Sequence, residues 1–191
     1  MIIKIIHSMT EVDANRWNNL HQDKSPFLRH EFLLALEQSG SVCAETGWQA
    51  HHLLVFDEDT LIAAMPLYLK SHSWGEYVFD QQWADAYAQS GMDYYPKWVN
   101  TIPFTPCSGQ RILIQDNVDT ALIIQRCIKT IKNISEHNNI SSFHCLFPNT
   151  QQTNVLKKHL LLREGVQFQW FNKGYKDFDD YDVSTLLWTQ N

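Results

Sequence analysis

The chain has 191 residues and a formal net charge of −6, with 15 Lys and Arg against 21 Asp and Glu. This length suits one domain, and a hydrophobic content of 44% is enough to fill a sizeable core. A negative surface provides no general attraction for polyanions or anionic lipid, so contact with a nucleic acid would need a local basic patch. The composition therefore predicts one compact globule and argues mildly against nucleic acid as a partner.

No segment suggests export or membrane insertion. The apolar run at residues 2–6 is too short for the core of a signal peptide, and no later run approaches the length of a membrane span. Cys43, Cys107, Cys127 and Cys145 lie far apart without C-x-x-C pairing, which favours buried free thiols over disulfides or zinc ligands. We therefore expect a cytoplasmic protein without a membrane span.

The first 70 residues are predicted to form a strand, two helices and a hairpin. Residues 2–6 predict the strand, a helix should follow Thr10, and a second helix should start at Ser25-Pro26 and end before Gly40. Apolar runs at 52–56 and 61–69 flank four polar residues, a pattern typical of two strands joined by a turn.

The second half predicts strands alternating with helices. A strand at 111–114 leads into the strongest predicted helix, with Asp116 or Asn117 as its cap. The apolar face of this helix consists of Ala121, Ile124, Ile128, Ile131 and Ile134. A strand at 142–147, a helix at 154–162 and a strand at 166–170 should follow. This order predicts an α/β (α+β) protein with a central sheet covered by helices.

Residues 74–111 are the most unusual segment. Nine of the 24 aromatic residues lie between Trp74 and Phe104, interleaved with charged side chains and without helical or strand alternation. A core segment would instead be apolar with a period near 3.6 or 2. The segment is therefore predicted to line a cleft.

Several motifs follow one another along residues 20–181: Ser25-Pro26-Phe27, Leu36-Glu37-Gln38-Ser39-Gly40, Thr46-Gly47-Trp48, Met65-Pro66-Leu67-Tyr68-Leu69-Lys70, Gly75-Glu76-Tyr77-Val78-Phe79-Asp80, Tyr94-Tyr95-Pro96-Lys97, Pro103-Phe104-Thr105-Pro106, Phe143-His144-Cys145-Leu146-Phe147 and Gln167-Phe168-Gln169-Trp170-Phe171-Asn172-Lys173-Gly174-Tyr175. In this consistent order they resemble the FemAB-like family of peptidoglycan-biosynthesis proteins.

The resemblance implies a GNAT-like acyl-CoA N-acyltransferase fold, a mixed sheet flanked by helices that FemAB proteins commonly carry as a tandem pair. Residues 1–181 would be the first such domain, whereas 182–191 diverge as a tail and the second domain is absent. The isolated chain would then be incomplete and inactive, or would rely on a homo-oligomer. The implied activity is transfer of an acyl or aminoacyl group to an amine, with acyl-CoA or aminoacyl-tRNA as donor and a small molecule or cell-wall precursor as acceptor.

Four residues of the aromatic segment are candidates for the chemistry of amide formation, which needs a base for the amine proton and donors for the oxyanion. Glu76 and Asp80 are the candidate bases, since nearby aromatic rings can raise the pKa of a carboxylate by desolvation. They could equally be structural anchors. Tyr94 and Tyr95 could protonate a leaving group or bind a carbonyl, or simply pack in the loop.

A second set of residues is predicted to bind substrate. Lys97 could pair with a phosphate of the donor. A turn rich in small and hydroxyl residues could present backbone N–H groups to a phosphate or oxyanion. Its members are Thr105, Ser108, Gly109 and Arg111.

The sequence lacks the pattern for coenzyme A binding and the pattern for a metal site. The GNAT pyrophosphate loop, Arg/Gln-x-x-Gly-x-Gly/Ala, does not occur between Ile114 and Thr120, which puts coenzyme A in doubt and makes a carrier such as tRNA more plausible. His51 and His52 are neighbours on opposite faces of a strand, and His144 is isolated in an apolar strand where a core role is the simpler interpretation. No metal site is predicted.

The alternative to an enzyme is a noncatalytic module whose aromatic cleft stacks on a sugar or peptide. Trp83, Tyr94 and Trp98 would supply the rings.

Overall fold

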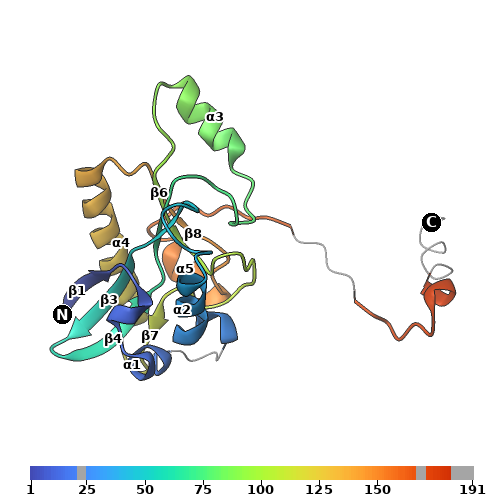
Figure 1. The fold of residues 1–191 in the computed structure, drawn as a ribbon, viewed down its shortest axis with the longest axis horizontal. Coiled ribbons are helices and arrows are strands. Elements are labelled where there is room, and N and C mark those ends of the chain that lie inside the picture. Colours follow the sequence, from blue (N-terminus) through green and yellow to red (C-terminus); the bar gives the residue numbers. More distant parts are fainter. Residues whose placement is uncertain (21–24, 167–170, 182–191) are drawn as a thin grey trace. The chain divides into compact units, whose positions relative to one another are not determined.

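The computed structural model describes residues 1–20, 25–166 and 171–181. It divides the chain into two compact units, Met1–Leu160 and Leu161–Asn191. All the sheets and helices named below belong to the first unit (Figure 1). The predicted tail at 182–191 and most of the predicted strand at 166–170 lie outside the described residues, and the single-domain boundary at 181 stays a prediction.

One four-stranded sheet is entirely antiparallel, in the order β1-β3-β4-β7. Its strands are β1 (Ile2–Ile6), β3 (His52–Asp57), β4 (Thr60–Met65) and β7 (Leu113–Ile114). β3 and β4 form the predicted hairpin, whose turn includes Glu58 at a φ of +50°. The two apolar runs and the acidic turn between them were sufficient to predict this pair.

The second sheet has the order β2-β5-β6-β8, and β6 runs parallel to β8. Its strands are β2 (Trp48–Ala50), β5 (Tyr68–Lys70), β6 (Lys97–Asn100) and β8 (Phe143–Cys145). The run at 61–69 was predicted as one strand, which is wrong: it is divided between β4 and β5. Pro66 lies between the two strands and has no N–H to donate, so the ladder is interrupted there.

Two short 3-10 helices, η1 (Met9–Glu11) and η2 (Pro26–Leu28), precede the first two α-helices of the first unit. The helices are α1 (Ala14–Asn18), α2 (His30–Gln38), α3 (Gln81–Gln89), α4 (Thr120–Asn138) and α5 (Thr150–Leu156). The predicted end of α2 is confirmed, because Gly40 follows its last turn at a φ of +73°. The α/β class with helices flanking the sheets is confirmed.

Three helix starts differ from the prediction. Pro26 starts η2, and α2 starts at His30 in place of the predicted Ser25-Pro26. Asp119 caps α4, because its Oδ1 accepts hydrogen bonds from the N–H groups of Ala121 (2.9 Å) and Leu122 (3.1 Å). The predicted caps, Asp116 and Asn117, precede it. α5 starts at Thr150, four residues before the predicted start, because Asn149 supplies a cap that the apolar pattern does not reveal.

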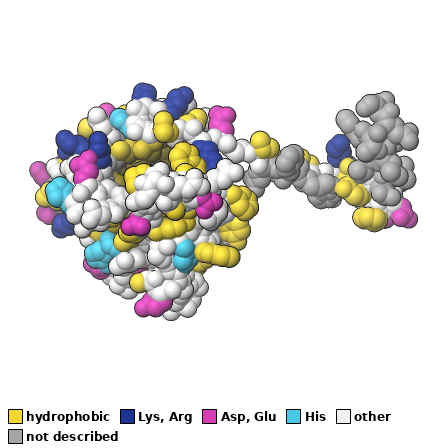
Figure 2. Space-filling model, turned by 90° about the horizontal axis from the view of Figure 1, so that it is seen from above, with side chains coloured by type: hydrophobic (Ala, Val, Ile, Leu, Met, Phe, Trp, Pro, Cys, Tyr) yellow, Lys and Arg dark blue, Asp and Glu magenta, His cyan; other side chains and the backbone are white. Residues whose placement is uncertain are grey.

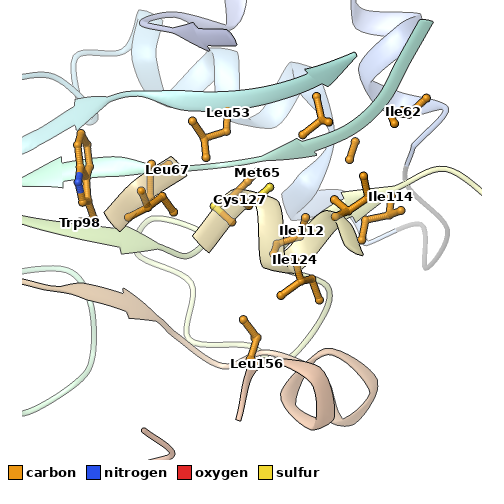
Figure 3. Packing of buried hydrophobic residues seen from close by; sticks show 14 residues of the cluster. Leu53, Ile62, Met65, Leu67, Trp98, Ile112, Ile114, Ile124, Cys127 and Leu156 are labelled. Atoms are coloured by element: carbon orange, nitrogen blue, oxygen red, sulfur yellow. The ribbon is translucent and has the colours of Figure 1, made fainter. Parts of the chain in front are cut away.

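The hydrophobic core lies on both faces of the antiparallel sheet. On one face Ile124 and Cys127 of α4 belong to one core cluster with Leu53 and Met65, and Figure 3 shows Cys127 next to Met65. On the other face the core contains Trp17 of α1 and Leu33 of α2. α4 therefore covers the sheet, as predicted, but its buried stripe is shifted around the helix and consists of Ile123, Ile124, Cys127 and Ile131. Of the predicted face, Ile124 and Ile131 are buried, Ile128 and Ile134 are half-buried and Ala121 is exposed.

The unusual segment at 74–111 contains one helix and one strand that the sequence did not predict. α3 has no buried residue and projects away from the sheets in Figure 1. β6 is fully buried and joins β5 to β8. The strand supplies a central position in the second sheet, and it brings Lys97 into the interior.

Candidate functional site

Two buried lysines face each other across neighbouring strands of the second sheet. Lys70 of β5 pairs directly with Lys97 of β6, and both side chains are 0% exposed. Like charges placed opposite each other destabilise a sheet. The cluster therefore needs negative partners, and Glu76 and Asp80, in the segment between these strands, supply them.

Lys97 is the centre of the cluster. Its Nζ donates hydrogen bonds to Glu76 Oε2 at 2.9 Å, Asp80 Oδ2 at 2.5 Å and Ser73 Oγ at 2.8 Å. Both carboxylates are almost fully buried, so these are interior ion pairs. The three donor positions of the ammonium are matched by three acceptors.

Lys70 is held by an aromatic face and a carbonyl. Its Nζ lies 3.6 Å from the centroid of the Trp48 ring and donates to the carbonyl of Trp74 at 3.2 Å. Burial lowers the pKa of Lys70 to about 7. The nearby carboxylate of Glu76 raises this pKa, and the nearby Lys97 lowers it by a smaller amount. This ammonium is therefore easily deprotonated in the folded chain.

The two carboxylates respond to the cluster in opposite directions. Burial raises the pKa of Glu76 more than the lysines lower it. Burial also acts on Asp80, but its hydrogen bonds from Lys97, Ser73 and Tyr94 prevail and lower its pKa. Glu76 Oε1 is buried and has no hydrogen-bond partner within the described part of the chain. Glu76 is thus the better proton acceptor, and Asp80 the better permanent anion.

The loop before α3 takes the shape that these contacts require. Gly75 has a φ of +81°, and a Cβ there would lie 2.6 Å from the ring of Phe104, so only glycine fits. Asp80 is the N-cap of α3, yet its side chain makes no capping bond and is used by Lys97 instead. The helix end gives up a side-chain cap so that the carboxylate can serve the cluster.

Hydroxyl groups extend the cluster towards the surface. Ser73 Oγ donates to Asp80 Oδ2 at 2.9 Å and lies 2.8 Å from the hydroxyl of the half-buried Tyr95. The hydroxyl of Tyr94 donates to Asp80 Oδ2 at 2.8 Å. It also lies 3.4 Å from Nε2 of His144.

The structure thus brings together five of the residues selected from the sequence: Glu76, Asp80, Tyr94, Tyr95 and Lys97. Lys97 does not present its charge at the surface, however, so the expected ion pair with a donor phosphate has no geometric support. The sequence pattern placed Lys97 in a polar loop, because β6 was not predicted.

The predicted anion-binding turn is engaged inside the protein. The backbone N–H groups of Thr105, Gly109 and Arg111 donate to Ile102 O, Phe147 O and Gln152 Oε1. Their distances are 3.3, 3.2 and 2.7 Å, respectively.

Arg111 is fully buried in the same turn. Its guanidinium donates to the carbonyls of Leu146, Gln110 and Cys107, so it ties β7 to the segment after β8. Ser108 is exposed, and Trp83 lies on α3 with about half of its surface exposed. None of these contacts joins the turn or Trp83 to the lysine and carboxylate cluster.

The start of α4 does not suit a diphosphate. The carboxylate of Asp119 accepts from the first free amides of the helix, and the segment 115–119 carries no Lys or Arg. A phosphate placed there would meet a carboxylate in place of N–H donors. The residues therefore do not fit the pyrophosphate of coenzyme A at this helix end.

Three residues of the cluster were not selected from the sequence: Ser73, Ser142 and His144. Ser142 and His144 alternate on β8 and the residue before it, so they share one face of the strand, which is a signal the sequence did contain. Ser142 Oγ lies 2.9 Å from His144 Nε2. His144 is therefore no isolated core residue.

Other expectations have simpler outcomes. The four cysteines are free, and of these Cys127 is buried, with burial raising its pKa to about 12. Among the described residues no helix is long and apolar enough to cross a membrane, and no three His, Cys, Asp or Glu side chains are grouped to hold a metal ion. A hollow of about 410 Å³ next to Arg16, Asp59 and Gln115 contains no residue of the cluster.

The sequence matches the FemAB-like family, described as peptidoglycan biosynthesis/recognition, over residues 8–186. The chain is therefore a member of the FemAB-like family.

No curated protein matches the chain. Among solved structures, the apo crystal structure of an aminoglycoside antibiotic 6′-N-acetyltransferase from Acinetobacter haemolyticus is similar, with 14% identity and a TM-score of 0.48. The match covers 91% of this chain and 98% of that one. A likeness of this size identifies neither the activity nor the substrate of the chain.

Proposed function

We propose that the chain is an N-acyltransferase that joins an activated acyl or aminoacyl group to an amine, the amine belonging to a cell-wall precursor. Family membership supports the cell-wall connection. The observation that carries the proposal is the buried network of Glu76, Asp80 and Lys97. A buried carboxylate whose pKa is raised by burial and which also pairs with a buried lysine, as Glu76 does, is typical of functional sites.

In this proposal Glu76 receives the proton that the attacking amine loses. Its raised pKa and its Oε1, which has no partner among the described residues, allow it to bind a proton, while Asp80 stays ionised and pairs with Lys97. Ser73 connects the buried Lys97 to the half-buried hydroxyl of Tyr95, which gives the proton a route towards solvent. The amine must be neutral to attack, so the loss of its proton is part of the reaction.

For the donor, the structure favours an aminoacyl ester over coenzyme A. The N-terminus of α4 is occupied by the carboxylate of Asp119, so a diphosphate finds no donors there. We therefore propose charged tRNA as the first donor to be tested.

The test is mass spectrometry of reactions that contain the chain, a charged tRNA pool or acyl-CoA, and amine-bearing cell-wall precursors. We expect an acceptor to gain the mass of one acyl or aminoacyl group. Glu76→Gln should lower the rate by about 10²-fold or more, as expected for loss of a general base. Glu136→Gln, an exposed change on α4, serves as the matched control and should leave the rate unchanged.

The thermal midpoint of each variant separates a lost base from lost folding. If no acceptor gains mass with any donor, the transferase proposal is wrong. If Glu76→Gln folds and retains the full rate, amine deprotonation does not involve Glu76.

A second function, a noncatalytic surface that stacks on a sugar or peptide, is favoured by one observation. Exposed aromatic residues precede α3 and lie in its first turn: Trp74, Tyr77, Phe79 and Trp83 are 80%, 61%, 92% and 53% exposed. Figure 2 shows hydrophobic side chains exposed around a hollow, with Lys and Arg nearby.

The rings selected from the sequence do not form such a surface, because Tyr94 and Trp98 are buried. Titration of cell-wall sugars and peptides, followed by tryptophan fluorescence, tests this function. Binding that is lost in Phe79→Ala without any turnover in the natural chain would favour the module.

A further inference from the structure

Ser142 and His144 form a second polar pair, at the edge of the lysine and carboxylate cluster. Ser142 Oγ lies 2.9 Å from Nε2 of His144, and both side chains are half-buried. His144 aligns with Val99 of β6 in the parallel pairing, and the carbonyl of Ser142 accepts a hydrogen bond from the N–H of Trp98 at 2.8 Å. The pair is therefore fixed to a central strand of the sheet, while its side chains reach solvent.

Tyr94 connects the imidazole of His144 to the lysine and carboxylate cluster. The hydroxyl of Tyr94 lies 3.4 Å from His144 Nε2, and the Tyr94 ring packs edge-on to the imidazole with centroids 6.1 Å apart. The same hydroxyl donates a hydrogen bond to Asp80 Oδ2 at 2.8 Å. The oxygen of Tyr94 is therefore left as an acceptor towards His144. A histidine that gains a proton at Nε2 can share it with Tyr94, and the negative charge of Asp80 lies one hydrogen bond further on.

This arrangement contains the elements of an activated nucleophile. A hydroxyl lies within hydrogen-bond distance of a histidine, and the histidine has a fixed polar neighbour that stabilises its protonated form. It differs from a Ser-His-Asp triad, because the supporting group is a tyrosine and contacts the same ring nitrogen as the serine. The carboxylate acts through Tyr94, so Tyr94 and Asp80 are positioning residues.

We propose that Ser142 is a nucleophile that takes the acyl group from the donor before the amine receives it. This inference rests on the proposed acyltransferase function and adds a covalent step to it. Ser142 Oγ forms a bond to the acyl carbon, and the bond from that carbon to the donor's ester oxygen breaks. The proton of Ser142 passes to His144 Nε2 and then to the departing oxygen.

The second half of the reaction restores the serine. The amine nitrogen forms a bond to the acyl carbon, and the bond from that carbon to Ser142 Oγ breaks. Glu76 takes the first proton of the ammonium form before the attack, and the second proton of the nitrogen passes through His144 to Ser142 Oγ as the amide forms. Atoms and charges balance without a metal, an oxidant or a further reactant.

The experiment uses the whole chain and p-nitrophenyl acetate, an activated ester, with no amine acceptor present. We expect a burst of p-nitrophenolate equivalent to one site, one added acetyl group in the intact mass, and that acetyl group on Ser142 in peptide maps. Ser142→Ala should abolish the burst, and His144→Gln should slow it by about 10²-fold. Ser90→Ala removes an exposed serine hydroxyl at the end of α3 and should leave the burst unchanged.

The peptide map of the natural chain decides the matter even if a variant fails to fold. An acetyl group on another residue, or no stable acetyl group and no burst, overturns the proposal. Tyr94→Phe adds a readout for positioning: the burst should slow in the folded variant while its single site is retained.

The covalent step and the overall function fail separately. If Ser142 is acetylated but no acceptor ever gains mass, the nucleophile stands and amide formation does not. If folded Ser142→Ala forms the amide product at the natural rate, the function stands and the nucleophile does not.

Discussion

Replacing Lys97 with methionine is the most direct test of the buried cluster. The change keeps most of the volume and removes the charge that pairs with Glu76 and Asp80. Since Lys97 is fully buried and the two carboxylate side chains are 1% and 4% exposed, water cannot replace the lost hydrogen bonds. Removing one partner of a buried ion pair typically costs about 3–5 kcal/mol. We expect a loss in this range.

Urea unfolding followed by tryptophan fluorescence measures the loss. Trp17, Trp48 and Trp98 are buried, so their emission changes when the first unit unfolds. Lys129→Met on α4 is the matched control, because the same substitution there removes an exposed charge and should change the free energy of unfolding by no more than about 0.5 kcal/mol.

Two further results identify the cause. Lowering the pH should reduce the cost of Lys97→Met, because Glu76, with its raised pKa, becomes neutral first. Combining Lys97→Met with Glu76→Gln and Asp80→Asn should recover part of the stability, since no unpaired charge then remains buried. A cost for Lys97→Met equal to that of Lys129→Met would refute the buried ion pairs.

Three other changes test separate parts of the structure. The pKa of Lys70 falls from 10.5 to about 7 in the folded chain, so the unfolded chain binds more protons between these two pH values. The free energy of unfolding should therefore rise with pH across this range. Lys70→Met should remove that rise in urea titrations at a series of pH values. Glu37→Ala removes the carboxylate that accepts hydrogen bonds from Ser8, the Met9 amide and His52. The free energy of unfolding, measured by calorimetry, should therefore fall by about 2–3 kcal/mol. Asp119→Ala should cost about 1 kcal/mol in urea unfolding through the lost cap of α4, and an unchanged midpoint would show that the cap contributes nothing.

The features that the sequence predicted well have a long or regular signal. α4 extends over 19 residues, so its apolar stripe repeats through several turns. The β3–β4 hairpin combines two apolar runs with an acidic turn. In both cases the local pattern and the tertiary environment favour the same structure, so a reading of neighbouring residues is sufficient.

The second sheet shows why the rest was not predictable. Three of its strands have only three residues, and β6 places a lysine in the core, against the usual preference of charged side chains for solvent. Lys97 is acceptable there only because Glu76 and Asp80 lie within hydrogen-bond distance after folding. That compensation joins residues 17 and 21 positions apart, and no local pattern records it.

Stability alone gives a weak reason for this cluster. Four charged groups, Lys70, Lys97, Glu76 and Asp80, lose their hydration in the fold, and well-packed apolar residues of similar volume are often as stable as a buried ion pair. The cluster also leaves Glu76 Oε1 without a partner in the described residues.

A network that only held the sheet together would gain from satisfying that oxygen and would have no need to reach solvent. This one connects to half-buried hydroxyls at both ends, through Ser73 to Tyr95 and through Tyr94 and His144 to Ser142. A spare buried acceptor and two routes to the surface are the properties of a group that moves protons. These properties support the proposed proton transfer at this end of the sheet.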